Sequence, residues 1–166
     1  AECFASPLNC WWQQFCSAFP LTDSMFGSLG SFFNFHPKAG VFEANPPFIP
    51  EVMEWMVEHM EALLAGAEGP LGFIVVLPAW QQVPAWKMLQ RSPYRWRCSG
   101  AGQGWTGGGD DLITVPADAH GFCDGAQHIR QDRYRPSSFD TGIAFLRNAA
   151  QAELWAPVLN QALVDA

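Results

Sequence analysis

The clearest pattern of apolar and polar positions in this chain lies between residues 40 and 77. Gly40 to Ala44 has the length of a short strand, and Leu71 to Leu77 is a continuous apolar run, typical of a strand covered on both faces. Between them, Pro50 is expected to open a helix that ends by Gly66. Its apolar stripe consists of Val52, Met56, Met60 and Leu63. Its acidic solvent side consists of Glu51, Glu54, Glu58 and Glu61. Strand, helix and strand in such close succession predict a βαβ unit, so the sheet should be parallel.

The rest of the chain holds shorter candidates for regular structure. Glu2 to Asn9 is predicted to be the end of a strand that runs into a loop, because Pro7 stops regular pairing. Cys10 to Phe19 is expected to be helical, since Trp11, Phe15 and Phe19 are four residues apart and would share one face. The further candidates are a packed loop at Thr22 to Lys38, a basic helix at Pro84 to Arg95, an antiparallel hairpin of strands at Leu112 to Val115 and Thr141 to Leu146, and a helix at Leu154 to Val164.

These elements fit one domain. The 166 residues suffice for a single core, so residues 1–166 are expected to form one α/β domain, and the start at Ala1 rather than Met suggests a fragment of a longer protein. The run from Gly100 to Gly104 has the letters of a dinucleotide-binding fingerprint, but the fingerprint must follow a strand and open a helix. A loop follows here, so residues 99–111 are predicted to be a glycine-rich insertion.

Charge is distributed unevenly along the chain. The net charge of −7 argues against a nucleic-acid binder, yet residues 1–86 hold one basic residue against eight acids, whereas residues 87–166 hold eight of each. Four of these cations, Lys87, Arg91, Arg95 and Arg97, alternate with Trp86, Tyr94 and Trp96. Cations interleaved with aromatic rings suit phosphates and stacked bases, which makes Arg91, Arg95 and Arg97 candidates for substrate binding. A solvated helix face with buried ring anchors is the alternative.

Cysteine usage and apolar runs restrict the compartment. The five cysteines are an odd number, and no pair has the two-residue spacing of a zinc knuckle or redox motif, so reduced thiols and no metal site are expected. His36, His59 and His120 show no metal-ligand pattern either. No apolar run approaches the roughly 20 residues that span a membrane, and no signal peptide is visible. We therefore expect an intracellular protein, nuclear or cytoplasmic, with no membrane partner.

The tetrapeptide Asn45-Pro46-Pro47-Phe48 carries the candidate chemistry. It follows the first predicted strand, at the edge where open α/β sheets bind ligands. The amine of an adenine is a poor nucleophile, because its lone pair is delocalised into the ring. The side-chain oxygen of Asn45 and the carbonyl of Pro46 are two acceptors that would draw the amine hydrogens into hydrogen bonds and favour a pyramidal nitrogen. Proline also restricts φ and stiffens the turn.

The fourth residue of this motif, Phe48, offers a π-face to the base, worth about 1–3 kcal/mol. The motif therefore predicts transfer of a methyl group from a positively charged sulfonium donor to the exocyclic amine of an adenine, with positioning and fixed dipoles as the source of catalysis. The alternative interpretation is a rigid loop with a buried phenylalanine. Glu43, two residues before the motif, either supports it or is an ordinary acid at a strand end.

Several ordered motifs resemble the catalytic core of the phosphorylated-CTD-interacting factor family. They are Glu2-Cys3-Phe4-Ala5-Ser6-Pro7-Leu8-Asn9-Cys10, Phe15-Cys16-Ser17-Ala18-Phe19-Pro20, Phe26-Gly27-Ser28-Leu29-Gly30, Phe42-Glu43-Ala44-Asn45-Pro46-Pro47-Phe48, Phe73 to Trp80, Gly125-Ala126-Gln127-His128 and Ala144-Phe145-Leu146. The resemblance covers nearly the whole chain apart from the glycine-rich insertion.

This resemblance implies a Rossmann-like class I methyltransferase that uses S-adenosyl-L-methionine and modifies 2′-O-methyladenosine next to the 7-methylguanosine cap of mRNA. The tetrapeptide Asn45, Pro46, Pro47 and Phe48 is then catalytic. The residues expected to bind the cofactor are Glu2, Phe4, Ala5, Ser6 and Asn9, and Gln127 and His128 are expected to contact the substrate. The stretch before Asn45 is short for such a sheet, which leaves open whether its N-terminal part is complete.

The expected partner is capped mRNA or another adenine-containing nucleic acid. Members of the family carry a WW domain and a long helical region before this core, and the adjacent Trp11 and Trp12 lack the wide spacing of a WW module. Binding to the phosphorylated RNA polymerase II tail is therefore not expected from this chain alone. Two other functions stay open: a non-catalytic RNA-binding or adaptor module that retains the fold, and an adenine methyltransferase that acts on DNA or another substrate. A structural role for His128 also stays open.

Overall fold

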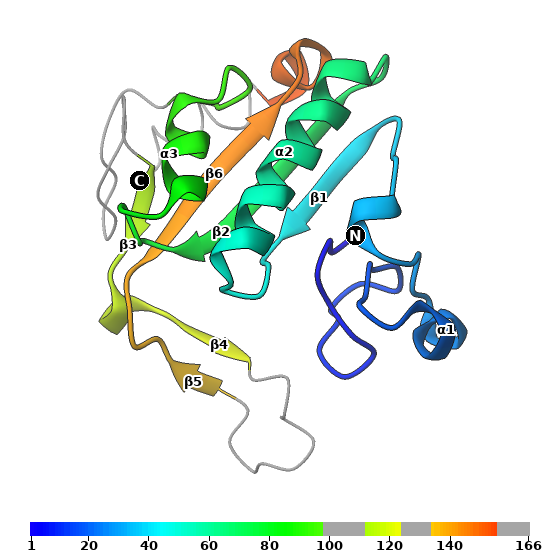
Figure 1. Ribbon diagram of the computed structural model, residues 1–166, viewed down its shortest axis with the longest axis horizontal. Coiled ribbons are helices and arrows are strands. Elements are labelled where there is room, and N and C mark those ends of the chain that lie inside the picture. Colours follow the sequence, from blue (N-terminus) through cyan, green and yellow to red (C-terminus); the bar gives the residue numbers. More distant parts are fainter. Residues whose placement is uncertain (98–111, 124–133, 156–166) are drawn as a thin grey trace.

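The sheet at the centre of the fold has four strands in the order β1-β2-β6-β3 (Figure 1). The computed structural model describes residues 1–97, 112–123 and 134–155. The strands are β1 (Gly40–Ala44), β2 (Leu71–Pro78), β3 (Ile113–Val115) and β6 (Thr141–Arg147), and β4 (Gly121–Cys123) pairs with β5 (Tyr134–Pro136) in a second, two-stranded sheet. The helices are α1 (Pro20–Asp23), α2 (Pro50–Gly66) and α3 (Pro84–Arg91), with short 3-10 turns η1 (Ser24–Phe26), η2 (Phe32–Asn34) and η3 (Ala117–Ala119).

The predicted βαβ unit is confirmed. β1 and β2 pair in parallel, with Gly40 opposite Leu71 and Ala44 opposite Val75, and α2 makes the crossover between them. Proline at the first position of α2 suits the helix, because its missing N–H has no intrahelical partner there. β6 lies between β2 and β3 and is antiparallel to both, as the predicted closing hairpin required, although β4 and β5 separate the two strands along the chain.

The core lies between α2 and the sheet. The buried side of α2 consists of Met53, Met56, Val57, Met60 and Leu64. The predicted stripe was therefore right for Met56 and Met60, whereas Val52 and Leu63 lie at its edges and are only half-buried. β2 is buried on both faces, as its continuous apolar sequence predicted.

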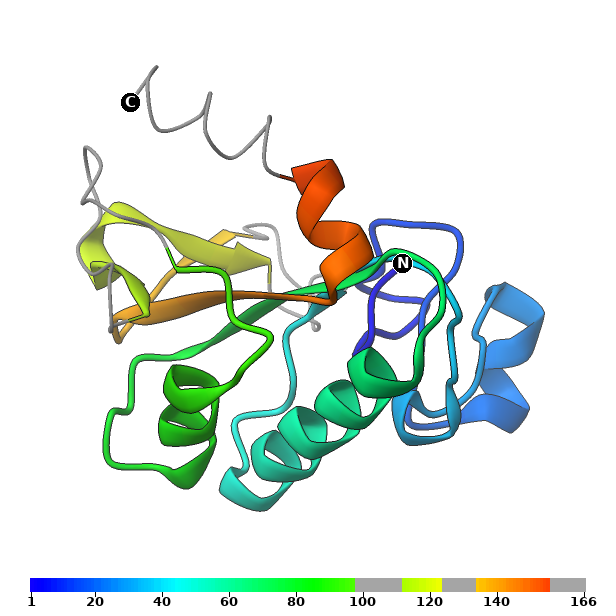
Figure 2. The same cartoon turned by 90° about the horizontal axis from the view of Figure 1, so that it is seen from above.

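Helices cover both faces of the sheet. α2 and α3 lie on one face, and the helical residues 149–155 lie on the other (Figure 2). Two glycines mark these contacts: a Cβ at Gly142 would collide with the ring of Trp86 from α3, and a Cβ at Gly72 would come within 2.8 Å of the Trp155 ring. The absence of a side chain at each position lets the helix approach the strand closely. Most of the helix predicted at Leu154 to Val164 lies outside the described residues.

Three short N-terminal segments continue the sheet beyond β1. The backbone around Glu2 pairs in parallel with Glu43, Phe15 pairs in parallel with Glu2, and Ser28 pairs in parallel with Phe15. The hydrogen bonds run from Cys3 N to Glu43 O (2.7 Å), from Cys16 N to Glu2 O (2.7 Å) and from Leu29 N to Phe15 O (2.8 Å). We call residues 1–5, 15–17 and 28–30 the N-terminal ladder. It brings the loop after Glu2 to the edge of the sheet at which β1 ends.

The helix predicted at Cys10 to Phe19 is wrong. Only four residues, Pro20–Asp23, form the helix α1, and Phe15 belongs to the N-terminal ladder. The four-residue spacing of Trp11, Phe15 and Phe19 misled the prediction, because Phe15 is fully buried while Trp11 is 86% and Phe19 72% exposed. Backbone pairing with a distant part of the chain therefore overrides the local pattern.

The helix predicted at Pro84 to Arg95 is shorter than expected. α3 ends at Arg91, since the residue before Pro93 disfavours the helical conformation. The following residues pair with β6 instead: Trp96 N donates to Phe145 O (2.8 Å), and Arg147 N donates to Tyr94 O (2.9 Å). This pairing places Arg95 at the sheet rather than on a helix face.

Candidate active site

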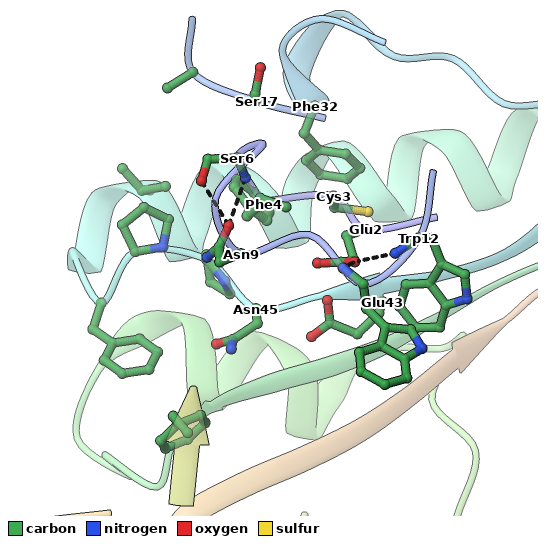
Figure 3. A pocket seen from close by; sticks show the side chains of 18 of the residues that line it. Glu2, Cys3, Phe4, Ser6, Asn9, Trp12, Ser17, Phe32, Glu43 and Asn45 are labelled. Carbon is green, nitrogen blue, oxygen red and sulfur yellow. Dashed lines mark hydrogen bonds between the residues drawn. The ribbon is translucent and has the colours of Figure 1, made fainter. Parts of the chain in front are cut away.

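A large cleft opens where β1 and the N-terminal ladder end. Its volume is about 1090 Å³, and its walls come from the N-terminal segments, the turn after β1, and residues 135–139. Ligands bind at this edge in open α/β sheets. The structure brings together nine of the residues singled out by sequence, namely Glu2, Phe4, Ala5, Ser6, Asn9, Asn45, Pro46, Pro47 and Phe48 (Figure 3).

The wall formed by Glu2 to Asn9 is held by its own hydrogen bonds. Glu2 is buried, and its Oε1 accepts hydrogen bonds from the backbone N–H groups of Trp11 (2.6 Å) and Trp12 (3.1 Å). The side-chain oxygen of Asn9 accepts from the backbone N–H (2.8 Å) and the hydroxyl (2.9 Å) of Ser6, which closes a tight turn. The loop backbone is therefore fixed beside the cleft before any ligand binds.

The side-chain oxygen of Asn45 is the most distinctive atom in the cleft. It is buried and has no hydrogen-bond partner among the described residues. A buried acceptor without a donor costs about 1–3 kcal/mol, so such atoms are rare unless a ligand supplies the donor. Asn45 follows β1 directly, and in Figure 3 its side chain lies below Asn9 and to the left of Glu43. The site is thus prepared for a ligand that donates a hydrogen bond.

The two prolines after Asn45 form a stiff turn. Pro46 is buried and Pro47 is exposed, and the Pro47 carbonyl accepts a bond from Ile49 N (2.7 Å). No backbone N–H in the described part of the chain donates to the Pro46 carbonyl. The turn therefore presents a second acceptor beside Asn45.

Phe48 lines the cleft and belongs to a group of aromatic rings. Its ring centroid lies 5.4 Å from that of Phe139 and 6.2 Å from that of Trp80, both with edge-to-face geometry. Phe122 lies 6.3 Å from Phe139 in a tilted arrangement. We call Phe48, Trp80, Phe122 and Phe139 the aromatic cluster. Edge contacts fix the Phe48 ring and leave this half of the cleft suited to a flat, apolar ligand.

Several residues of this site are not among those that the sequence alone made visible. Trp11 and Trp12 line the cleft although they are 86% and 48% exposed. Trp80 follows β2 closely, so the rule that ligands bind at strand ends would have found it. Phe139 and Arg135 line the cleft but come from the distant β5 region, and no local pattern indicates that Phe139 reaches Phe48.

Glu43 adds a carboxyl group to the lining of the cleft, between Glu2 and Asn45 in Figure 3. Its position on β1, two residues before Asn45, puts both side chains on the same face of the strand. Burial, and to a lesser extent the neighbouring charge of Glu2, raises the pKa of Glu43 to about 7. Near neutral pH this carboxyl group is therefore present in both its protonated and its ionised form.

The basic residues are not gathered at the cleft. Arg91 is exposed on α3 beside Lys87, and Arg97 is exposed beyond the pairing with β6. Arg95 is only 7% exposed, which contradicts its expected place on a solvent-facing patch. The reason is the pairing of residues 94–96 with β6, which turns Arg95 inward. Arg135 is the one basic residue that lines the cleft among the described ranges.

Some predicted features lie outside the described residues. They are Gln127, His128 and the whole glycine-rich insertion at 99–111. Within the described ranges no group of three or more histidine, cysteine or acidic side chains could hold a metal ion. None of the helices in those ranges is long and apolar enough to cross a membrane.

The sequence of this chain is similar to that of known proteins. A family model described as the phosphorylated CTD interacting factor 1 WW domain matches residues 1–125. The chain belongs to the phosphorylated CTD interacting factor 1 family. Members of this family named mRNA (2′-O-methyladenosine-N(6)-)-methyltransferase, from Homo sapiens and Mus musculus, are each 39% identical to it over 158 residues, or 94% of this chain.

The family match bears on two expectations from the sequence, the absence of a WW domain and the resemblance to this family. The description of the family model names a WW domain, against the expectation that this chain carries none. The matched residues include β1, α2 and β2, so the match extends over the α/β sheet. The chain spans 21% of the length of the human and mouse relatives, and the resemblance inferred from sequence motifs is confirmed at the level of the family.

Proposed function

We propose that this chain holds the site of methyl transfer from S-adenosyl-L-methionine to the exocyclic amine of adenosine in RNA, with 2′-O-methyladenosine of mRNA as the acceptor. The observation that carries this proposal is the buried, unpartnered oxygen of Asn45 in a cleft between the Glu2–Asn9 wall and the aromatic cluster. The names of the human and mouse relatives support the same reaction.

The fold supports this function through its strand order. With the N-terminal ladder included, the order is 28–30, 15–17, 1–5, β1, β2, β6 and β3, and all are parallel to one another except β6. Segments 1–5, 15–17 and 28–30 follow one another toward one edge of the sheet, whereas β1 and β2 follow one another from segment 1–5 toward the other edge. This reversal of strand order, with strand direction unchanged, is that of a doubly wound fold. We infer a Rossmann-like class I methyltransferase sheet whose first strands are reduced to single bridges.

The residues of the cleft fit S-adenosyl-L-methionine. Its cationic part suits the carboxyl groups of Glu2 and Glu43, and its adenosyl part suits the aromatic rings of the lining, among them Phe4 and Trp12. The volume of about 1090 Å³ accommodates the cofactor together with a nucleoside. When bound, this cofactor supplies a methyl group on a positively charged sulfur.

The acceptor amine is handled by Asn45 and Pro46. The Asn45 Oδ1 accepts one amine hydrogen and the Pro46 carbonyl accepts the other, which directs the nitrogen lone pair away from both acceptors. Phe48 holds the base by its π-face, while the edges of Phe139 and Trp80 keep that ring in place. Because these groups are fixed before the substrate arrives, little reorganisation is needed during the transfer.

Methyl incorporation tests the proposal directly. The chain is incubated with methyl-labelled S-adenosyl-L-methionine and short RNAs that begin with 2′-O-methyladenosine or unmodified adenosine, and with the matching DNA. We expect label on RNA and a preference for 2′-O-methyladenosine. A folded chain that binds no cofactor in calorimetry would instead favour the non-catalytic RNA-binding module, and equal labelling of DNA would favour a different adenine-containing substrate.

Substitution of Phe48 separates stacking from packing. If the ring holds the base, Phe48→Tyr and Phe48→Trp keep substantial activity, whereas Phe48→Leu raises the transition-state barrier by about 1–3 kcal/mol. Turnover and melting temperature are measured for all three variants. A role in packing alone gives the opposite ranking, with an active, stable leucine variant beside a destabilised tryptophan variant.

The exposed cations are expected to contribute to RNA affinity through phosphates. Replacing Arg91 and Arg97 with glutamine should reduce the slope of log affinity against log salt concentration by about 1.4, since each contact to a single strand contributes about 0.7. Fluorescence anisotropy with a labelled RNA measures this slope. Lys38→Gln is the control, because Lys38 is exposed before β1. An unchanged slope in the double variant means that these arginines make no contact with the RNA phosphates.

A further inference from the structure

We propose that Glu43 is a specificity-determining residue that makes the cleft prefer the positively charged methyl donor over the neutral thioether product left after transfer. This inference rests on the proposed function and adds to it a reason for product release. It concerns a residue to which neither the tetrapeptide chemistry nor the comparisons give a role.

The position of Glu43 is set by β1 and the N-terminal ladder. Backbone bonds from Cys3 N to Glu43 O (2.7 Å) and from Glu43 N to Ala1 O (3.1 Å) fix it in parallel register with Glu2. The Glu43 side chain projects on the same face as that of Asn45. In Figure 3 its carboxyl group lies between the Glu2 carboxyl group and the Asn45 amide. The methyl group transferred to an amine at Asn45 must therefore leave a sulfur close to Glu43.

The two carboxyl groups of the cleft differ in what they already bind. Glu2 Oε1 accepts hydrogen bonds from the backbone N–H groups of Trp11 and Trp12, so this oxygen already has partners within the loop. The Glu43 carboxyl group makes no hydrogen bond or ion pair within the described ranges of the chain. Arg135, the basic residue of the lining among the described ranges, belongs to β5. Glu43 is thus the group whose charge is available to a cationic ligand.

Electrostatics then distinguishes donor from product. The donor carries a positive sulfur and an ammonium group, whereas the product keeps the ammonium group and has an uncharged sulfur. An ionised carboxylate in a partly buried site attracts a nearby cation far more strongly than it would in water. Transfer of the methyl group removes the positive charge on sulfur, so the attraction between the Glu43 carboxylate and the sulfur is lost when the product must leave.

The protonation state of Glu43 supports this role. Its pKa of about 7 reflects burial first and the charge of Glu2 second, and the amino group at Ala1 acts in the opposite direction. Cys3 also faces this region, but burial raises the pKa of its thiol far above neutral pH, so it stays protonated. The β2 residues that pair with β1 carry no titratable side chains beside Glu43. Donor binding should therefore release a proton from Glu43 near neutral pH.

Calorimetry with two probes tests the inference. S-adenosyl-L-methionine and S-adenosyl-L-homocysteine are titrated into the parent chain, Glu43→Gln and Glu58→Gln at pH 8. Glu58 is an exposed acid on α2, away from the cleft, and serves as the matched control. We expect Glu43→Gln to reduce the ratio of donor affinity to product affinity by about tenfold, the effect of one pKa unit of differential interaction, and Glu58→Gln to leave it unchanged.

A second measurement does not depend on the folding of the variant. In the parent chain, the ratio of donor affinity to product affinity should rise between pH 6 and pH 8, and donor binding at pH 7 should release a proton, seen as a dependence of the heat on the buffer. Equal losses of both affinities in Glu43→Gln, or a ratio in the parent that is independent of pH, overturn the inference alone. A folded parent chain that binds neither compound overturns the proposed function and the inference with it.

Discussion

Asn45→Ala is expected to lower kcat/KM for methyl transfer by about 10²- to 10³-fold, the usual cost of removing one fixed polar group that acts on the reacting atoms. The Asn45 oxygen is buried and unpartnered, so its removal leaves no other group unsatisfied in the free protein. Folding should therefore be preserved, and affinity for S-adenosyl-L-methionine should stay within a few-fold of the parent. Single-turnover kinetics and calorimetry measure the two effects separately.

Two further variants sharpen the test of Asn45. Asn45→Asp keeps an acceptor oxygen at the same place and should retain more activity than Asn45→Ala. Asn34→Ala removes an exposed asparagine in η2 and should behave as the parent. A large loss of cofactor affinity in Asn45→Ala, at an unchanged melting temperature, would assign Asn45 to the donor rather than to the amine.

Trp86→Ala should have the largest effect on stability, about 3–5 kcal/mol of the free energy of unfolding. Trp86 is fully buried on α3, and its ring lies over Gly142 of β6, where no side chain stands to fill the resulting cavity. A domain of this size is stable by only about 5–15 kcal/mol, so the variant should approach the limit of folding at 37 °C. Urea denaturation followed by circular dichroism measures the difference.

A tryptophan of opposite environment provides the control. Trp55 on α2 is 57% exposed, and Trp55→Ala should change the free energy of unfolding by no more than about 0.5 kcal/mol. The prediction fails if the two alanine variants have the same urea midpoint, because α3 would then contribute little to the packing of the sheet.

The elements that the sequence predicted well are those with strong local patterns. β1 and α2 begin where Gly40 and Pro50 indicated, and β2 is buried on both faces as its apolar sequence required. Phe15 shows the limit of such patterns: it is spaced as in a helix but is buried by backbone pairing with Glu2 and Ser28. Arg95 is a second case, since pairing with Leu146 outweighs the basic character of its segment.

The candidate site divides in the same way. Its tetrapeptide and the Glu2–Asn9 wall were visible in the sequence because each is one continuous stretch next to a strand end, and their catalytic roles stay predictions. The aromatic cluster was not visible. Phe48, Trp80, Phe122 and Phe139 meet only because β6 lies antiparallel beside β2 and carries the β5 region back to the cleft. No periodicity along the chain encodes a contact made at that separation.

The N-terminal ladder has a consequence for hydrogen exchange. β2 and β6 pair over seven residues, so exposing their amides requires most of the sheet to open. The amides of Cys3, Cys16 and Leu29 are each protected by an isolated bridge, and they exchange through small local openings at much lower free energy. The two walls of the cleft therefore belong to different cooperative units. The amides of the wall from Glu2 to Asn9 should therefore exchange faster than those of β1, at whose end the tetrapeptide begins.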